Sequence, residues 1–239
     1  MKFYESGDSR KPVIFLFPGT CCLYSSFDHI LDRLHSYFYT VTVSYDGFDP
    51  NEKTEFYSME DECEKIEQEI KKKYDGRIKA AYGCSLGGSF VSLLIQRKRI
   101  HIDHGIIGSS DMDEAGQFMA KIQSSVVAPI MYKMVHTGKL LKFMQKKINE
   151  ADESEKELVK GFLNMFGIDQ GGSPWITKQS IYNQFYSDLV TKVQHGIDVP
   201  GTRIHVFYAT KMGKKYEKRY CTYFKNPDIR RRNMQHVFV

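Results

Sequence analysis

The stretch Tyr82-Gly83-Cys84-Ser85-Leu86-Gly87-Gly88 decides the fold that we predict for this chain. It follows the short apolar run Ile78–Tyr82 and precedes an amphipathic run at Ser89–Ile95, which predicts a strand, a tight turn and a helix in that order. A G-x-S-x-G motif in this context is typical of a turn that presents a serine nucleophile. The alternative interpretation is a glycine-rich turn that contains a bystander serine.

Runs of strand length, apolar or β-branched, recur on both sides of this turn. The predicted strands lie at Phe3–Glu5, Pro12–Phe17, Tyr39–Ser44, Ile78–Tyr82, His104–Gly108, Arg203–Ala209 and Pro227–Arg232. Helical patterns separate most of them, around residues 27–34, 58–73, 89–95 and 216–224. This alternation predicts the α/β class, with a mostly parallel central sheet flanked by helices.

Four polar residues follow predicted strands directly: Thr20, Asp46, Ser85 and Asp111. The carboxyl ends of parallel strands meet at one edge of the sheet, and sites in α/β proteins lie beyond that edge. We therefore expect these residues to lie near one another.

Between about residues 114 and 193 the alternation stops and only helical patterns remain. We predict an α/β core at 1–113 and 194–239 with a helical lid inserted at 114–193. The insertion is rich in methionine and aromatic residues, including Phe118, Met119, Met131, Tyr132, Met134, Phe143, Met144, Met165 and Phe166. Most of them are expected to pack within the helices, and some to line a pocket, because binding sites favour apolar, adaptable walls.

Charge, apolar segments and cysteine content indicate which partners, location and metal sites to expect. The chain has 239 residues and a net charge of +5, and its short basic runs lack aromatic stacking partners, so nucleic acid is not expected as a partner. No secretory signal or membrane span is predicted, and five cysteines, an odd number, favour reduced thiols and a cytoplasmic location. Cys21-Cys22 has no second pair or histidine at metal spacing, so a zinc site is not expected.

A serine hydroxyl needs a base to accept its proton and a third group to orient that base. Of the eight histidines, His236 follows the last predicted strand at the active edge and is the predicted base. The predicted acid is Asp111, the carboxylate nearest its strand, with Asp113 and Glu217 as alternatives. The competing interpretation of Asp111 is a helix N-cap.

The negative charge that develops during acyl transfer needs backbone N–H donors. Leu86, which follows the serine at the start of a helix, is predicted to supply one, and Thr20, after Pro18-Gly19, the other. Cys21 and Cys22 are expected at most to border the pocket, and Cys84 to be buried against the sheet.

These residues resemble the α/β-hydrolase superfamily in four places: Phe17-Pro18-Gly19-Thr20, Ser44-Tyr45-Asp46-Gly47, Gly83-Cys84-Ser85-Leu86-Gly87-Gly88 and His236. The resemblance covers the whole chain apart from the insertion. It implies an eight-stranded, mostly parallel sheet and cofactor-free acyl transfer to water through an acyl-serine intermediate.

The chain departs from the superfamily pattern twice. Members usually have Gly-x-x-Asp after the penultimate strand, where this chain has Gly213-Lys214-Lys215-Tyr216. Some lipase-like members place the acid one strand earlier, which suits Asp111. Members usually also carry a final helix after the histidine, whereas this sequence ends three residues past His236, so we expect a truncation or a missing helix.

The function expected from the sequence is a serine hydrolase, carboxylesterase-like, that cleaves a small or medium acyl ester of a small molecule. The same residues are compatible with an amidase, a thioesterase or an acyltransferase, because the fold does not choose among these reactions. A protein of another class, a non-catalytic binding protein on the same fold, is the remaining alternative.

Overall fold

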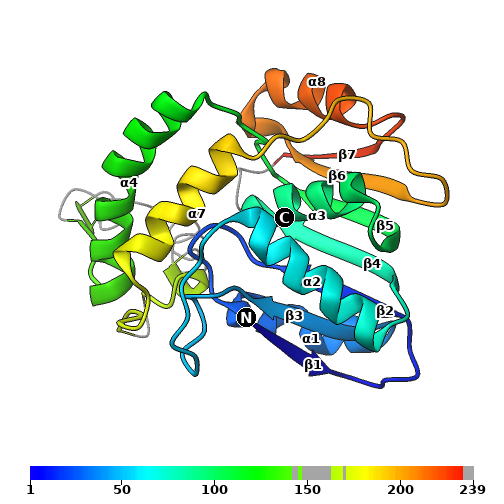
Figure 1. Ribbon diagram of the computed structural model, residues 1–239, viewed down its shortest axis with the longest axis horizontal. Helices are drawn as coiled ribbons and strands as arrows, with labels where there is room; N and C mark the ends of the chain where they lie inside the picture. The colour runs from blue at the N-terminus through cyan, green and yellow to red at the C-terminus, as the bar shows by residue number, and fades with distance from the viewer. Residues whose placement is uncertain (142–144, 147–162, 169–170, 234–239) are drawn as a thin grey trace.

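The computed structural model of the protein describes residues 1–141, 145–146, 163–168 and 171–233. Its centre is a sheet in the order β1-β3-β2-β4-β5-β6-β7 (Figure 1). The strands are β1 (Lys2–Ser6), β2 (Val13–Phe17), β3 (Tyr39–Ser44), β4 (Arg77–Cys84), β5 (His101–Gly108), β6 (Arg203–Ala209) and β7 (Asp228–Arg232). β1 pairs with β3 in the antiparallel sense, and all other neighbours are parallel.

The predicted mostly parallel sheet is therefore confirmed, with two differences. The described residues form seven strands, not the eight that the resemblance implies. In addition, β5 begins at His101 rather than His104, because its ladder with β4 extends back to the pair Arg77 and His101. The first difference leaves the centre of the sheet, where β4 lies between β2 and β5, as expected.

Helices cover both faces of the sheet, which explains the continuous apolar run of β2. Phe15 and Phe17 point to one face and are fully buried in the main core. Ile14 and Leu16 point to the other face and pack with Phe27 in a separate, smaller cluster. The helices are α1 (Asp28–His35, after the 3-10 turn η1, Tyr24–Phe27), α2 (Met59–Lys73), α3 (Leu86–Arg97), α4 (Gln117–Thr137), α7 (Lys178–Val190) and α8 (Lys214–Tyr223, after η2, Thr210–Met212).

The long charged helix predicted at 58–73 forms as α2. The Ser58 hydroxyl accepts a hydrogen bond from the Asp61 N–H at 3.1 Å and so caps the helix. Cys63, Ile66 and Ile70 are fully buried, which confirms the apolar face that the spacing predicts.

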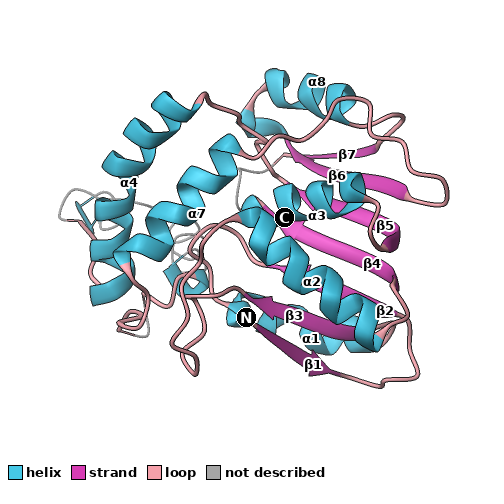
Figure 2. Cartoon of the chain, in the orientation of Figure 1, coloured by secondary structure: helices cyan, strands magenta, loops and turns pink. Residues whose placement is uncertain are grey.

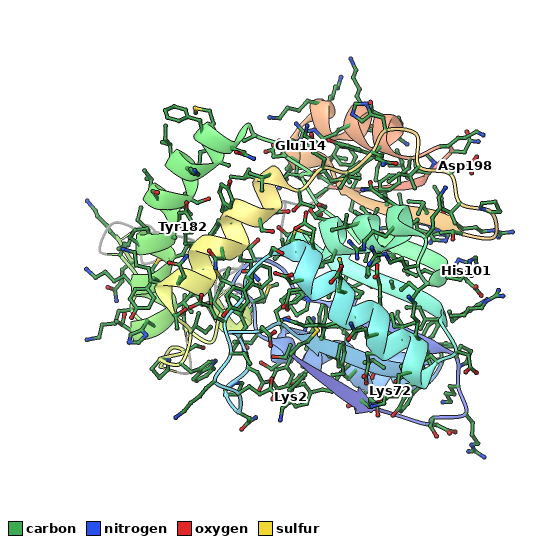
Figure 3. The ribbon with its side chains drawn as sticks, in the orientation of Figure 1. Lys2, Lys72, His101, Glu114, Tyr182 and Asp198 are labelled. Atoms are coloured by element: carbon green, nitrogen blue, oxygen red, sulfur yellow. The ribbon has the colours of Figure 1, made fainter. Side chains whose placement is uncertain are left out.

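Between β5 and β6 the regular elements of the described chain are helices, as predicted. The helices α4 and α7 lie side by side beyond the carboxyl ends of the strands, and Figure 2 shows no strand among them. Figure 3 places His101, at the start of β5, on the opposite edge of the sheet from Tyr182 of α7. Within the described ranges, no helix is both long and apolar enough to cross a membrane.

Candidate active site

Ser85 lies on the turn that joins β4 to α3 and has the backbone angles φ 52° and ψ −120°. A positive φ is costly for a residue with a side chain, so the surrounding structure has to hold the turn. The Ser85 N–H donates to the Gly108 carbonyl at 2.9 Å, and the Gly88 N–H donates to the Ser85 carbonyl at 2.8 Å. These two bonds fix Ser85 between the neighbouring strand and its own helix.

The glycines of the motif are required by close backbone contacts. A Cβ atom on Gly83 would lie 2.0 Å from the Gly87 carbonyl oxygen, and one on Gly87 would lie 2.1 Å from the Phe17 carbonyl oxygen. Real Cβ atoms do not come so close to backbone atoms. The motif therefore specifies a strand, a strained serine and a helix that pass in contact, which is the predicted turn.

Ser85 lines a cavity of about 400 Å³ at the carboxyl edge of the sheet. Three further predicted site residues, Thr20, Asp111 and Asp113, line the same cavity, whereas Asp46, which we expected near them, is not among its described lining residues. The described residues around it are Gly19, Thr20, Cys22, Cys84, Ser85, Asp111, Asp113, Gln123, Ser124, Val127, Met131, Met165, Phe166, Phe185, Asp188 and Leu189. Met131, Met165 and Phe166 confirm that part of the methionine and aromatic content of the insertion lines a pocket.

The three carboxylates proposed from the sequence as the acid lie in different surroundings. Asp111 and Asp113 both line the cavity, and Asp113 is ion-paired with Arg219. Glu217 lies on α8 and pairs with Arg231 of β7. It is not among the described residues that line the cavity.

The loop that carries Asp111 is held by α8. Arg219 donates a hydrogen bond to the Asp111 carbonyl, and the Tyr220 hydroxyl donates to the Ser110 carbonyl. The Tyr223 hydroxyl donates to Glu114 Oε1 at 2.9 Å, and Figure 3 shows Glu114 beside α8. Three side chains of one helix thus fix the backbone on which two of the candidate acids stand.

The two predicted backbone donors come from two different segments, the start of α3 and the loop after β2. Leu86 is the first residue of α3, where N–H groups have no partner inside the helix. Thr20 lies in the loop after β2, whose next residue, Cys21, has the strained φ of 59°. The Cys21 N–H donates to Gln184 Oε1 of α7 at 2.7 Å, which holds this loop against the insertion.

Cys22 and Cys84 also line the cavity, and burial keeps their thiols protonated. Burial raises the pKa of the Cys84 thiol to about 11 and that of Cys22 well above its ordinary value. Protonated thiols are poor nucleophiles, so neither sulfur is expected to be reactive near neutral pH.

Sequence reasoning missed Asp188 of α7, which is partly accessible where it lines the cavity. Its surroundings raise its pKa to about 7, chiefly through burial and then through the charge of Asp111, while a hydrogen bond with Ser89 acts in the opposite direction. Ser89 Oγ also lies 3.3 Å from Ser110 Oγ. The side chains of Ser89, Ser110 and Asp188 thus form a polar network that connects α3, the loop after β5 and α7. The signal in the sequence was the helical spacing of Ser180, Gln184, Ser187 and Asp188 on one face of α7.

No histidine of the described residues lines this cavity. His236, the predicted base, lies outside the described residues. His205 of β6 hydrogen-bonds to His104 of β5 and to Asp228, each at 3.1 Å, but the register places Asp228 at the beginning of β7, away from the carboxyl edge. In the described part of the chain, no cluster of three or more His, Cys, Asp or Glu residues has a geometry that could hold a metal ion.

Comparisons with known proteins support the fold but do not identify a substrate. No protein-family model matches the chain, and no curated protein matches it in sequence. Among solved structures it is similar to a protein assigned to the α/β-hydrolase family from Desulfitobacterium hafniense, with a TM-score of 0.75, 15% identity, and coverage of 96% of this chain and 90% of the other. It is also similar to a hydrolase from Pseudomonas aeruginosa, with a TM-score of 0.70, 12% identity, and coverage of 98% and 86%.

A third similar structure is a thermophilic esterase from Thermogutta terrifontis, with a TM-score of 0.69, 13% identity, and coverage of 97% of this chain and 84% of the other. All three alignments span nearly the whole chain at low identity. The chain therefore has the α/β-hydrolase fold, as its motifs indicate.

Proposed function

We propose that the protein is a serine hydrolase that cleaves a small or medium acyl ester through an acyl-serine intermediate. The observation that carries this proposal is the strained backbone of Ser85, at φ 52°, on a turn that opens into a cavity. A protein rarely maintains such strain without a use for it. The raised pKa values of the two buried thiols beside Ser85 support the choice of the serine as the nucleophile of this cavity.

The proposed reaction has two steps. In the first, Ser85 Oγ attacks the carbonyl carbon of the ester while His236 accepts the hydroxyl proton and passes it to the departing alcohol. In the second, a water molecule attacks the acyl-serine, His236 accepts a proton from the water and returns one to Ser85, and the carboxylic acid leaves. Asp111 orients His236 and stabilises its positive charge.

The tetrahedral intermediate of each step carries a negative oxygen, for which Thr20 and Leu86 are the proposed N–H donors. The N–H of Leu86 has the added favourable field of the α3 amino terminus. The apolar part of the cavity wall, which includes Val127, Phe166 and Leu189, suits the hydrocarbon of an acyl group.

Hydrolysis of short p-nitrophenyl esters tests this proposal. Ser85→Ala is expected to lower kcat by at least about a thousandfold, because the attacking atom is lost. Cys84→Ala is the matched control and is expected to keep most of the activity, because the wild-type Cys84 thiol is protonated and has no role in the proposed reaction. Equal activity of Ser85→Ala and the wild type would contradict the proposal. Absence of hydrolysis across esters, thioesters and amides would favour the non-catalytic alternative.

The acid is tested by three substitutions that keep the shape of the side chain. Asp111→Asn is expected to lower kcat by about a hundredfold or more, whereas Asp113→Asn and Glu217→Gln are expected to change it by less than about threefold. A large loss in either of the latter two, with Asp111→Asn unaffected, would move the acid to that residue.

A further inference from the structure

The helix α4 is apolar on two opposite faces. Ala120, Ala128 and Val135 are fully buried on the face that packs toward α7. The same side of the helix contributes Ser124, Val127 and Met131 to the wall of the cavity. A helix that is apolar all round is normally buried all round, so the second face needs an explanation.

The outward face of α4 carries a continuous apolar stripe. Phe118, Ile122, Val126 and Ile130 follow one another at intervals of four residues and are exposed by 75%, 44%, 60% and 43%. Met119, exposed by 49%, lies beside them. Residues four apart share one side of a helix, so these side chains form one surface about 18 Å long. Soluble proteins rarely leave such a surface without a partner.

The charges on α4 have a single sign. The helix, which the structure describes from end to end, contains Lys121 and Lys133 and no Asp or Glu. Both lysines are exposed. At 100° per residue Lys133 falls on the axis of the stripe, whereas Lys121 falls about 60° outside its edge at Phe118, on the flank next to the buried face. The edges of the stripe are formed by the exposed, uncharged residues Gln123 and Ser125, so the only charges on the helix are the two cations. An exposed apolar stripe with cations and no acidic residue suits a lipid surface with anionic headgroups.

We propose that the stripe Phe118–Ile130 of α4 docks on an anionic lipid surface, with the helix parallel to that surface. The apolar side chains would enter the boundary between headgroups and acyl chains, and Lys121 and Lys133 would contact the anionic headgroups. Lying flat agrees with the absence, within the described residues, of any helix able to span a membrane. A second copy of the chain fits this face less well, because two basic helices would repel each other.

Docking in this orientation would bring the cavity close to the lipid. The stripe and the cavity wall are opposite sides of one helix, about 10 Å across. Ser124, which lines the cavity at 1% exposure, has no hydrogen-bond partner for its hydroxyl among the described residues. Lipid contact on the outer face would therefore act on a wall that is held mainly by apolar packing.

Flotation with lipid vesicles tests the proposal without reference to turnover. The protein, carrying Ser85→Ala so that no lipid is consumed, is mixed with vesicles of phosphatidylcholine alone or of phosphatidylcholine with phosphatidylglycerol. Binding is expected to the mixed vesicles and to be roughly tenfold or more weaker with phosphatidylcholine alone, and to weaken as salt is added. Failure to float with the mixed vesicles would overturn the proposal.

Substitutions locate the contact. Phe118→Ser combined with Val126→Ser is expected to lower the affinity for mixed vesicles about tenfold or more. The matched control is Tyr37→Ser, which removes a ring of 69% exposure elsewhere and is expected to leave the affinity unchanged. Lys121→Glu combined with Lys133→Glu keeps the stripe and is expected to remove the preference for anionic vesicles. Circular dichroism confirms that each variant is folded.

Two results would contradict the assignment of the occupant. If the double serine variant bound as well as the wild type, the stripe would not be the docking surface. If the wild type formed a dimer by sedimentation equilibrium and the double serine variant were monomeric, a second copy would occupy the face.

Discussion

The two long helices between β5 and β6, α4 and α7, both line the cavity beside Ser85 but are held in different ways. α7 is joined to the rest of the protein by polar side chains: Gln184 accepts from the Cys21 N–H, Ser187 from the Met59 N–H at 2.7 Å and Ser180 from the Phe56 N–H at 3.3 Å. Asn183 adds a bond to the Phe56 carbonyl at 2.8 Å. These bonds satisfy backbone groups of the loop after β2 and of the start of α2.

Among the described residues, the side chains of α4 make no hydrogen bond to another element, and its one polar tie to another segment in that part of the chain is the Ser173 N–H, which donates to the Val135 carbonyl at 2.6 Å. Its described neighbour is α7, and its own buried serine, Ser124, has no partner for its hydroxyl among the described residues. The side chains of α7 therefore hold the loop that contains Thr20 and Cys21, whereas those of α4 contribute mainly apolar packing. The boundary at residue 114, which treats both helices as one lid, remains a prediction.

The largest effect is expected from Gln184→Met, which removes the acceptor but roughly keeps the volume of the side chain. Gln184 is fully buried, so the Cys21 N–H would be left without a partner. Chemical denaturation is expected to show a loss of about 2 kcal/mol. The matched change on α4, Gln123→Met at an exposed position, is expected to stay within about 0.5 kcal/mol. Equal losses for the two variants would remove the contrast between the helices.

The next effect concerns the pH dependence of stability through Asp188. Its pKa is raised to about 7 from an ordinary value of 3.8, so the folded state holds its proton more tightly than the unfolded state does. The contribution of this group is therefore most favourable below about pH 4 and is lost as the pH rises toward 7. The groups that face it are Asp111, Asp113 and the hydroxyl of Ser89.

Asp188→Asn removes this titration, and thermal unfolding across that range measures the difference. The free energy of unfolding of the wild type is expected to fall relative to the variant by roughly 1 to 2 kcal/mol between pH 4 and pH 8. This is less than the full shift implies, because Asp188 is partly accessible to water. Glu62, whose pKa is also raised to about 7, is common to both proteins and cancels in the difference. Parallel curves would show that Asp188 has an ordinary pKa.

The smallest effect compares two buried serines, one on each helix. Ser187→Ala on α7 takes the acceptor from the Met59 N–H in the first turn of α2, and a loss of about 1 kcal/mol is expected. Ser124→Ala on α4 removes a hydroxyl that has no partner among the described residues, so stability is expected to stay the same or rise slightly. A clear loss at Ser124 would reveal a bond that holds α4 in place.

The parts of this fold that follow local rules could be predicted from the sequence. The strands β2 and β3 and the turn at Ser85 are specified by neighbouring residues: apolar runs, β-branched side chains and glycines that permit contact. The apolar face of α2 follows from spacing alone. In each case the signal lies within about a dozen residues, because it concerns one element and the face that it buries.

Gln184 and Asp188 could not be predicted because their roles arise from contacts between distant segments. Gln184 bonds to Cys21 and Asp188 to Ser89, and no local pattern links these pairs. The choice among Asp111, Asp113 and Glu217 needed the same kind of information. The structure separates them by surroundings: two line the cavity, and Glu217 pairs with Arg231 on β7.

The most direct test of the nucleophile is covalent labelling with a fluorophosphonate, followed by mass spectrometry of the digested protein. We expect one adduct, on the peptide that contains Ser85, and no adduct in Ser85→Ala. Cys84→Ala should be labelled like the wild type, because the protonated Cys84 thiol of the wild type is not expected to react with the probe. An adduct on another residue, or a folded protein that hydrolyses esters but takes up no label at Ser85, would contradict the assignment of Ser85 as the nucleophile.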